Sequence, residues 1–380
     1  MKILHISASY KPAYIYGGPI MSVGALCEAL VKAGTQVEVF TTTANGSTEL
    51  SLTSNVPVKV DGVTVTYFKR ITKDHTHLSP LLLKTLRARI KEFDAVHIHA
   101  WWNLVSVLAA LTAVKKGVPV ILSPRGTLSA YSFINRNNLK KKLIHLALGK
   151  KLLPKCHIHA TAQTEANAFM GLVKPVSINV IPNFVKLPAQ LPAVRYIDET
   201  SPLRLLFFSR IEEKKGLDIL LKALPYLNFS FSLTIAGTGE PEYIKSLQAL
   251  INDTGIAQKI NWIGFVNEDK FNVLSDHHLM VLPSHDENFG NVVIESLSVG
   301  TPVLISDKVG LADYVAEKNL GWICKAENED LARQLNQSYR GFSQAFERIN
   351  TTAPSIIRED FNADKLVQQY IALYKKATNL

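Results

Sequence analysis

The sequence contains 380 residues, of which 47% are hydrophobic and 19% are charged, a balance typical of a globular protein with a sizeable core. This length suits two domains of ordinary size and excludes a single small module. The formal net charge of +10 indicates an anionic partner. The three cysteines are widely scattered, which argues against a disulfide framework or a metal knuckle and is typical of a reducing compartment.

The amino-terminal half alternates short apolar runs of strand length with segments of helical periodicity. The expected strands are Ile3–Ser7, Gln36–Thr41, Ala95–His99, Val118–Ser123 and Ile158–Ala160, and the expected helices are Ser22–Ala33, Leu81–Glu92 and Leu104–Lys116. The first run lacks the pattern of a secretory signal, and the longest apolar stretch, Leu104–Val114, is too short to span a bilayer. We therefore expect a cytoplasmic protein.

A basic segment lies between residues 136 and 155, where seven Lys and Arg residues occur without any acidic residue. Apolar residues interleave with them, which predicts an amphipathic basic helix. Two interpretations stay open: a solvated helix over the core, and docking to an anionic membrane surface, where each Lys contributes about 1 kcal/mol. Nucleic acid is not an expected partner, because no aromatic platform or known reading motif accompanies the charge.

The second half restarts the alternation of strands and helices. Its expected strands are Leu203–Ser209, Phe231–Ala236, Ile260–Gly264, Leu279–Leu282 and Val303–Ser306. Repeated βαβ units predict parallel sheets covered by helices on both faces. The polar stretch Leu187–Pro202 separates the halves, so we expect two doubly wound, Rossmann-like domains, 1–186 and 187–360, with a final helix, about 360–380, packing back on the first or staying with the second. Ligands of such sheets bind beyond the carboxyl ends of the strands, here in a cleft between the domains.

The most informative motif lies between Pro283 and Pro302, where Glu287 and Glu295 flank an Asn-Phe-Gly-Asn turn. An apolar run of strand length precedes the turn, and a helix with a Gly300 stop signal follows it. The free N–H groups and the positive dipole end of such a helix favour a phosphate, and the two carboxylates can accept hydrogen bonds from hydroxyl groups. The segment therefore predicts a site for a sugar nucleotide.

Two cations follow the first strand of the same half. Arg210 and Lys215 stand five positions apart across a tight turn, an arrangement that suits a phosphate. The alternative is a polar loop in which Arg210 pairs with Glu212 or Glu213.

A glycine pair, Gly17 and Gly18, follows the first expected strand of the chain and permits close approach of the backbone to a ligand. Neither a dinucleotide fingerprint nor a Walker A sequence is present. No Asp-x-Asp pair of the metal-binding type occurs near the expected site, so neither a metal nor another cofactor is expected.

The combination of these motifs resembles the retaining nucleotide-sugar glycosyltransferases of family 4, which have the GT-B fold. The matching residues are Ser209-Arg210 with Lys215-Gly216, Ala236-Gly237-Thr238-Gly239, Gly264-Phe265-Val266, Pro283-Ser284 through Glu287-x7-Glu295, Gly300-Thr301-Pro302-Val303 and Ile181-Pro182-Asn183. The resemblance covers nearly the whole chain. It implies transfer of a sugar from a nucleoside diphosphate, with UDP favoured over GDP and glucose as the expected sugar, to a saccharide or lipid-linked saccharide in polysaccharide or glycan biosynthesis.

The resemblance also implies a role for each matched residue. Arg210 and Lys215 would neutralise the diphosphate as the sugar leaves, and Glu287 would bind hydroxyl groups of the donor sugar, so these three are the expected catalytic residues. The other residues expected at the donor are Gly17, Gly18, Gly237, Phe265, Val266, His285, Asn288, Phe289, Gly290, Asn291, Val292 and Glu295. Glu295 would bind the ribose, and Phe265 with Val266 would lie against the base.

The chain departs from the common family pattern after the fourth expected strand, where many members carry a His. Here the sequence reads Pro124-Arg125-Gly126, which is similar to a Pro-Arg-Gly subgroup of the family. Arg125 is expected to bind acceptor or phosphate. His99 and Glu165 are further acceptor-side candidates, with a core position and a helix cap as their alternatives. A lipid-linked acceptor would place the basic segment 136–155 at the inner face of the cytoplasmic membrane.

Two other functions stay open with the same fold. One is a nucleotide-sugar epimerase or phosphorylase-like enzyme, and the other is a nucleotide-binding protein without turnover. The complete set of Arg210, Lys215 and paired glutamates argues against the second of these.

Overall fold

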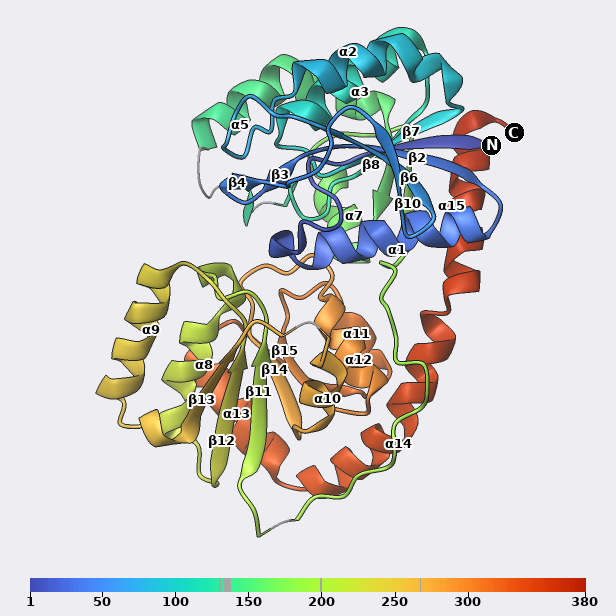
Figure 1. Ribbon diagram of the computed structural model, residues 1–380. Helices are drawn as coiled ribbons and strands as arrows, with labels where there is room; N and C mark the ends of the chain where they lie inside the picture. Colours follow the sequence, from blue (N-terminus) through green and yellow to red (C-terminus); the bar gives the residue numbers. More distant parts are fainter. Residues whose placement is uncertain (130, 133–137, 199, 267) are drawn as a thin grey trace. The chain divides into compact units, whose positions relative to one another are not determined.

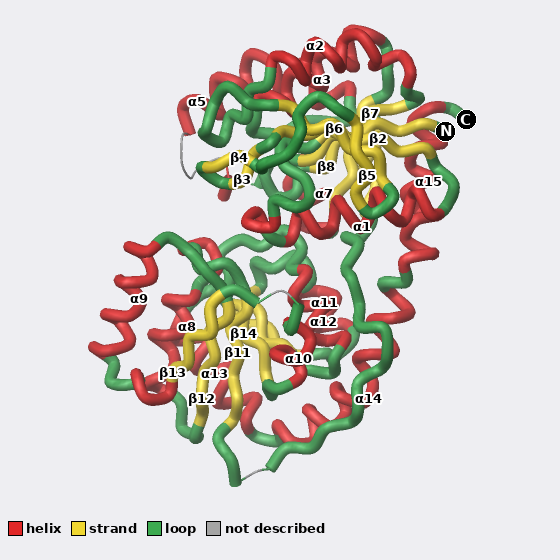
Figure 2. The backbone as a smooth tube through the Cα atoms, viewed as in Figure 1, coloured by secondary structure: helices red, strands yellow, loops and turns green. Residues whose placement is uncertain are grey.

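The structure is a computed structural model, which describes residues 1–129, 131–132, 138–198, 200–266 and 268–380 (Figure 1). The chain divides into two compact units: unit 1 comprises Met1–Phe184 and Ala363–Leu380, and unit 2 comprises Val185–Asn362. Each unit is built on a largely parallel sheet with helices on both faces, coloured by type in Figure 2. The predicted α/β class with two Rossmann-like sheets is therefore confirmed.

Unit 1 contains an eight-stranded sheet in the order β10-β9-β8-β7-β1-β2-β6-β5. Its strands are β1 (Lys2–Ile6), β2 (Gln36–Thr42), β5 (Pro57–Val60), β6 (Val63–Phe68), β7 (Ala95–His99), β8 (Val120–Ser123), β9 (His157–Ala160) and β10 (Ser177–Val180). The sheet is parallel apart from the β5–β6 hairpin. This hairpin was not among the predicted strands, although Asp61-Gly62, with both residues at positive φ, is a typical two-residue hairpin turn.

The two faces of this sheet bury different sets of residues, because successive side chains of a strand point to opposite faces. Ile3 packs with the helices α1 (Gly18–Lys32) and α15 (Ala363–Thr378). Leu4 packs in the other cluster, under α2 (Pro80–Arg89) and α3 (Leu104–Lys116). The final helix of the chain therefore belongs to the core of unit 1.

The basic segment of unit 1 is helical over the residues that the structure describes. It consists of α5 (Asn138–Ile144), the π-helical turn η3 (His145–Gly149), α6 (Lys150–Leu152) and η4 (Leu153–Lys155). Arg136, part of the predicted basic segment, lies outside the described residues. Among the residues that the structure describes, no helix combines the length and the apolar character that crossing a membrane requires.

Shorter elements complete unit 1. They are η1 (Tyr14–Tyr16), β3 (Ala44–Asn45), β4 (Thr48–Glu49), η2 (Ile90–Glu92) and α7 (Gln163–Met170). The strands β3 and β4 form a small antiparallel pair of their own.

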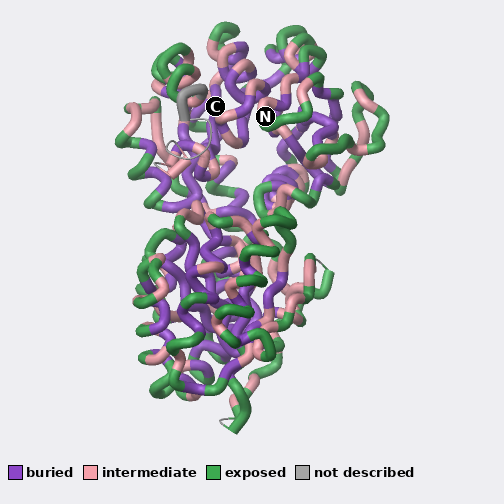
Figure 3. The backbone as a smooth tube through the Cα atoms, turned by 90° about the vertical axis from the view of Figure 1, so that its left-hand side faces the viewer, coloured by how far each residue is buried: buried purple, intermediate pink, exposed green. Residues whose placement is uncertain are grey.

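Unit 2 contains a six-stranded parallel sheet in the order β13-β12-β11-β14-β15-β16. Its strands are β11 (Leu203–Phe208), β12 (Phe231–Ala236), β13 (Ile260–Gly264), β14 (Leu279–Leu282), β15 (Val303–Ser306) and β16 (Gly321–Cys324). All but β16 were predicted. The sheet interior and the surrounding helices form one continuous apolar cluster, and Figure 3 shows the buried residues in the interior of each unit.

The helices of unit 2 follow its strands in the usual βα alternation. They are η5 (Glu213–Lys215), α8 (Leu217–Ala223), η6 (Leu224–Tyr226), α9 (Pro241–Asp253), η7 (Ala257–Lys259), α10 (Lys270–Ser275), α11 (Asn291–Ser298), α12 (Ala312–Glu317), α13 (Asn328–Tyr339) and α14 (Phe342–Asp360).

Candidate functional site

The strand order of unit 2 brings three of the predicted segments to one edge of the sheet. β11 lies between β12 and β14, and all three strands are parallel. Arg210–Lys215 follows β11, Gly237 follows β12, and His285–Glu287 follows β14. Strands to either side of β11 come from later βα units, so this edge is the switch point at which ligands bind to doubly wound sheets.

Lys215 and Glu287 meet at this edge as an ion pair. Lys215 Nζ donates a hydrogen bond to Glu287 Oε2, and Lys215 is only 8% exposed. Burial by itself raises the pKa of Glu287, but the charge and hydrogen bond of Lys215 outweigh it, with smaller contributions from Lys214 and Arg210. The pKa of Glu287 therefore lies below its ordinary value, and the carboxylate is ionised at neutral pH.

Two glycines allow the loops beyond these strands to touch. A Cβ on Gly216, at φ 70°, would lie 2.1 Å from the carbonyl oxygen of Pro283. A Cβ on Gly237, at φ 151°, would lie 1.8 Å from the carbonyl oxygen of Ser209. Both positions therefore require glycine. The contact at Gly216 holds the loop that carries Lys215 against the loop that carries Glu287, and the contact at Gly237 holds the loop after β12 against the loop after β11.

Arg210 forms the local pair that the sequence left open as an alternative. Its Nη1 lies 2.5 Å from Glu212 Oε1, and the two side chains are 45% and 41% exposed. An ion pair this exposed typically contributes only about 0–1 kcal/mol, so the guanidinium can exchange Glu212 for another anion at little cost.

The Asn-Phe-Gly-Asn turn leads directly into α11. Gly290, at φ 91°, is the N-cap residue and, being glycine, offers no side chain to cap the helix. Phe289 is 2% exposed and packs edge-on against Phe361, so it can offer only its backbone to a ligand. Glu295, in α11, pairs with Lys270 at 2.6 Å, a partner that the sequence analysis did not identify.

The remaining predicted donor residues of unit 2 differ in exposure. Phe265 is 61% exposed, and it follows Gly264, whose carbonyl oxygen accepts a 2.7 Å hydrogen bond from the N–H of Gly237. Val266 is half-buried against the core. His285 is exposed, and Asn288, Asn291 and Val292 are half-buried.

The acceptor-side candidates of unit 1 gather around the Pro124-Arg125-Gly126 turn, which follows β8. Glu165 is buried; its Oε1 accepts a hydrogen bond from the N–H of Gly126, and its Oε2 accepts one from the N–H of Thr161, both at 2.8 Å. Glu165 therefore ties the turn to Thr161, just before α7 (Gln163–Met170) begins. Gly17, at φ 69°, ends η1, and α1 begins at Gly18 without a side-chain cap.

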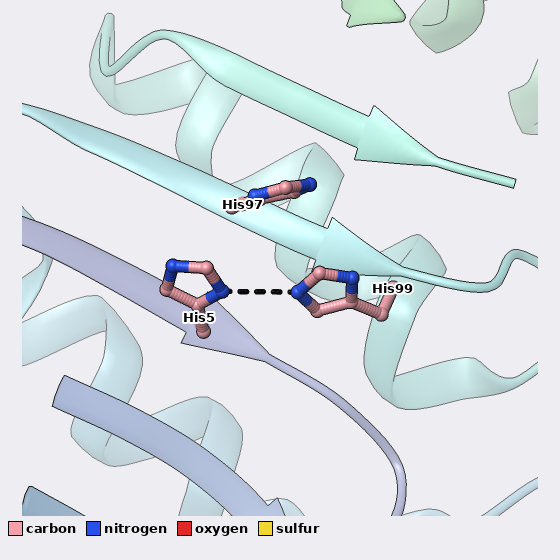
Figure 4. Close-up of side chains that lie close together, drawn as sticks. All are labelled: His5, His97 and His99. Carbon is pink, nitrogen blue, oxygen red and sulfur yellow. Dashed lines mark hydrogen bonds between the residues drawn. The ribbon is translucent and has the colours of Figure 1, made fainter. Parts of the chain in front are cut away.

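His99 is buried in a cluster with His5 and His97, drawn in Figure 4. Ring nitrogens of the three lie within 4.8 Å of one another, close enough for a metal ion. However, His5 Nδ1 lies 3.0 Å from His99 Nε2, and the nitrogens of His97 lie 2.7 Å from Tyr374 Oη and 2.6 Å from Ser123 Oγ. These hydrogen bonds already use the nitrogens that a metal would need, so the cluster is a hydrogen-bonded network.

Two protein-family models match the chain. Glycosyltransferase Family 4 matches residues 16–187, and Glycosyl transferases group 1 matches residues 196–341, so together they cover most of both units. The chain belongs to the family 4, group 1 glycosyltransferases. This glycosyltransferase is therefore an enzyme of EC class 2.4 that uses a nucleotide-sugar donor, and the predicted family is confirmed.

Known proteins similar to this glycosyltransferase align along its full length. An uncharacterized glycosyltransferase of Methanocaldococcus jannaschii is 23% identical, with 100% of this chain and 99% of that protein covered. Sucrose-phosphate synthase from Thermosynechococcus elongatus superposes with a TM-score of 0.77 at 17% identity, covering 99% of this chain and 98% of that one. Anabaena HepE in complex with UDP-glucose superposes with a TM-score of 0.73 at 20% identity, covering 100% of both chains. These likenesses show the GT-B fold; the Pro-Arg-Gly subgroup stays a prediction.

Proposed function

We propose that this glycosyltransferase moves a sugar, with retention of anomeric configuration, from a UDP-sugar, with UDP-glucose favoured, to a hydroxyl group of a saccharide or lipid-linked saccharide in polysaccharide or glycan biosynthesis. The observation that carries the proposal is the ion pair of Lys215 and Glu287 between the loops after β11 and β14, close in sequence to the start of α11 at Asn291. The complex of Anabaena HepE with UDP-glucose, a protein of similar fold, supports the choice of donor.

The proposed mechanism assigns the main work to leaving-group stabilisation. As the bond between the sugar carbon and the phosphate oxygen breaks, negative charge accumulates on the diphosphate. Arg210 and Lys215 neutralise that charge together with backbone N–H groups of α11, and Glu287, held by Lys215, accepts hydrogen bonds from hydroxyl groups of the sugar. Because these cations supply the neutralisation, we propose that transfer needs no metal, which activity in excess EDTA would support.

The test compares UDP release from UDP-glucose, with a lipid-linked saccharide acceptor, for Arg210→Ala, Lys215→Ala and Glu287→Ala. We expect turnover to fall about 100- to 1000-fold for each variant, the usual effect of removing one group that stabilises transition-state charge. Lys222→Ala is the matched control, because Lys222 pairs only with Asp218 on the surface of α8. Wild-type turnover in both cation variants would show the mechanism to be wrong.

We further propose that the basic segment 136–155 contacts an anionic membrane surface. Leu143 and Leu146 are 58% and 57% exposed in this segment, and the neighbouring Lys142 and Lys150 are exposed as well. Exposed leucines beside lysines suit insertion into an interface with anionic headgroups. This arrangement supports a lipid-linked acceptor.

Vesicle flotation tests the membrane contact. Lys142→Glu/Lys150→Glu should weaken binding to phosphatidylglycerol vesicles at least tenfold, since each lysine contributes about 1 kcal/mol. Lys115→Glu/Lys116→Glu, at the exposed end of α3, is the control with the same charge change. Equal losses for the two double variants would refute a specific role for the segment.

A further inference from the structure

Arg125 is a half-buried cation without a counter-charge. Its Nε donates a 3.3 Å hydrogen bond to His99 Nδ1, and its Nη1 donates to Ser22 Oγ at 3.0 Å and to Asn183 Oδ1 at 2.9 Å. All three acceptors are neutral, and among the described residues no carboxylate lies within ion-pair distance of the guanidinium. Glu165, the acidic residue with the strongest influence on Arg125, accepts hydrogen bonds from backbone N–H groups of the neighbouring turn instead. A desolvated charge without a partner is costly, so a ligand anion would complete this site.

The hydrogen bonds that lead away from Arg125 have a defined direction. A guanidinium can only donate, so His99 Nδ1 accepts, and a neutral His99 carries its proton on Nε2. His99 Nε2 then donates to His5 Nδ1 over 3.0 Å, which leaves the proton of His5 on Nε2. That nitrogen faces the hydroxyl oxygen of Tyr374, at a long 3.5 Å.

The far end of the network independently gives the same direction. The carbonyl oxygen of Ile181 can only accept, so His159 Nε2 donates to it over 2.8 Å. His159 Nδ1 then accepts from the Ser123 hydroxyl at 2.6 Å, and Ser123 Oγ accepts from His97 Nε2 at 2.6 Å. His97 Nδ1 must therefore accept from the Tyr374 hydroxyl, at 2.7 Å.

The two halves meet consistently at Tyr374, which donates to His97 and accepts from His5. The result is a one-directional chain of hydrogen bonds from Arg125 to Ile181 that crosses β1, β7, β8 and β9 and includes one residue of α15. It requires all four histidines to be neutral. Burial, with the charge of Arg125 as a smaller cause, lowers the pKa of His5 and of His159 to about 3.

We propose that Arg125 binds a phosphate or carboxylate group of a substrate, and that the chain of hydrogen bonds ending at Ile181 holds its guanidinium in place for this purpose. Nη1 and Nε are used by the protein, whereas Nη2 has no partner among the described residues. Through Ser22 the guanidinium is also tied to the amino-terminal part of α1, where the helix dipole favours an anion. Because this site would bind a substrate of the reaction, the inference rests on the proposed glycosyl transfer.

Histidine nitrogen NMR tests the direction of the chain. With 15N-labelled histidine at pH 7, His5, His97, His99 and His159 should all be neutral and protonated on Nε2. If any of these four histidines were protonated on Nδ1, or charged, the proposed direction would be wrong, because a change of tautomer in one ring reverses the hydrogen bonds to its neighbours. A merely structural packing of the same rings would not require one common tautomer.

Calorimetry of two probes tests the anion site. Inorganic phosphate is titrated into free and UDP-saturated protein, and UDP is titrated separately, for the wild type and Arg125→Gln. Arg87→Gln, an exposed arginine of α2, is the matched control. We expect Arg125→Gln to lose at least tenfold in affinity for one probe, as removal of a charged hydrogen-bonding partner does.

The affected probe identifies the source of the anion. A loss of UDP affinity assigns the anion to the donor diphosphate, whereas a loss of phosphate binding only on UDP-saturated protein assigns it to the acceptor. Unchanged affinity for both probes would overturn the proposal. A wild-type protein that does not bind UDP would refute the proposed donor, while the phosphate titration of the free protein would still decide the role of Arg125.

Two tyrosines of α15 provide the test of positioning. Tyr374→Phe removes the hydroxyl that joins the two halves of the chain, and it should weaken whichever probe depends on Arg125 while the fold persists. Tyr370→Phe is the control, because Tyr370 is equally buried in α15, but the hydrogen bonds of its hydroxyl go to His159 and to the carbonyl oxygen of Pro182, at the far end of the chain from Arg125. Equal affinities in the two variants would show that the chain does not position Arg125.

Discussion

Two glutamates of similar appearance in the sequence have different surroundings in unit 2. Glu287 pairs with the almost fully buried Lys215, whereas Glu295 pairs with Lys270, and both of those side chains are 15% exposed. At Glu287, burial raises the pKa, but the charge and hydrogen bond of Lys215 lower it by more. The residue chemistry of this site therefore depends on Lys215 more than on any other single side chain.

Replacing Lys215 should change how stability depends on pH. In the wild type the pKa of Glu287 lies below its unfolded value, so its stabilising contribution is complete above about pH 4.3 and is lost only as the pH falls through the lower folded value. In Lys215→Met, burial is opposed by the smaller contributions of Lys214 and Arg210, so we expect the pKa of Glu287 to rise and the folded variant to gain a proton and stability as the pH falls.

Urea unfolding at pH 7 and pH 5 measures this effect. We expect Lys215→Met to cost about 1.5–3 kcal/mol at pH 7 and less at pH 5. The double variant Lys215→Met/Glu287→Gln should show no such difference between the two pH values. If Lys215→Met lowered the free energy of unfolding by the same amount at pH 7 and at pH 5, the assignment of the titration to Glu287 would be contradicted.

At the scale of elements, the site depends on loops that touch through their backbones. The turns after β11, β12 and β14 approach one another at Gly216 and Gly237, where a side chain would meet a carbonyl oxygen. The N–H of His285 also donates to the carbonyl oxygen of Lys214 at 2.9 Å. The strand order brings these loops to one edge, and the glycines bring them into contact.

A matched pair of glycines separates the contact from the backbone conformation. Gly216 and Gly255 have φ 70° and 69°, but a Cβ on Gly255 would have nothing within 4 Å. Gly255→Ala should therefore lower the free energy of unfolding only by the penalty for an alanine in the left-handed conformation, about 1 kcal/mol, which thermal unfolding measures. Gly216→Ala should cost more and also weaken UDP binding; equal melting temperatures would refute the importance of the contact with Pro283.

At the scale of the whole chain, the C-terminal helix α15 completes the unit that the N-terminal residues begin. Leu373, Tyr370 and Tyr374 pack in the same cluster as Ile3 of β1, although more than 360 residues separate them in sequence. The core cluster on this face of the unit 1 sheet is therefore complete only when α15 has been made. Unit 2, in contrast, is continuous in sequence.

Two leucine substitutions test whether each unit has its own stability. Leu373→Ala, in α15, and Leu335→Ala, in α13, each remove a nearly fully buried side chain, at a typical cost of 2–5 kcal/mol. Hydrogen exchange should accelerate in unit 1, including β1 and β7, for Leu373→Ala, and in unit 2 for Leu335→Ala. Acceleration throughout the chain in both variants would mean that the units unfold as one.

The sequence by itself determined the alternation of strands and helices, the division into two α/β sheets and the family. These properties follow from local apolar periodicity and from motifs whose residues are close along the chain, such as Glu287 with Glu295. It missed β10 and β16, edge strands whose residues are mostly half-buried and carry a weaker apolar signal, and it also missed the β5–β6 hairpin, although β6 is mostly buried.

Only the tertiary structure decided which distant side chains meet. The sequence pointed to His99 but did not indicate that His5, His97, His159 and Tyr374 join it in one network, because those contacts depend on strand order and on the return of α15. It named Arg210 and Lys215 together, yet one is exposed beside Glu212 and the other is buried against Glu287. Apolar periodicity predicts which residues of an element face the core. The side chains that each of these residues contacts there depend on how the whole chain folds.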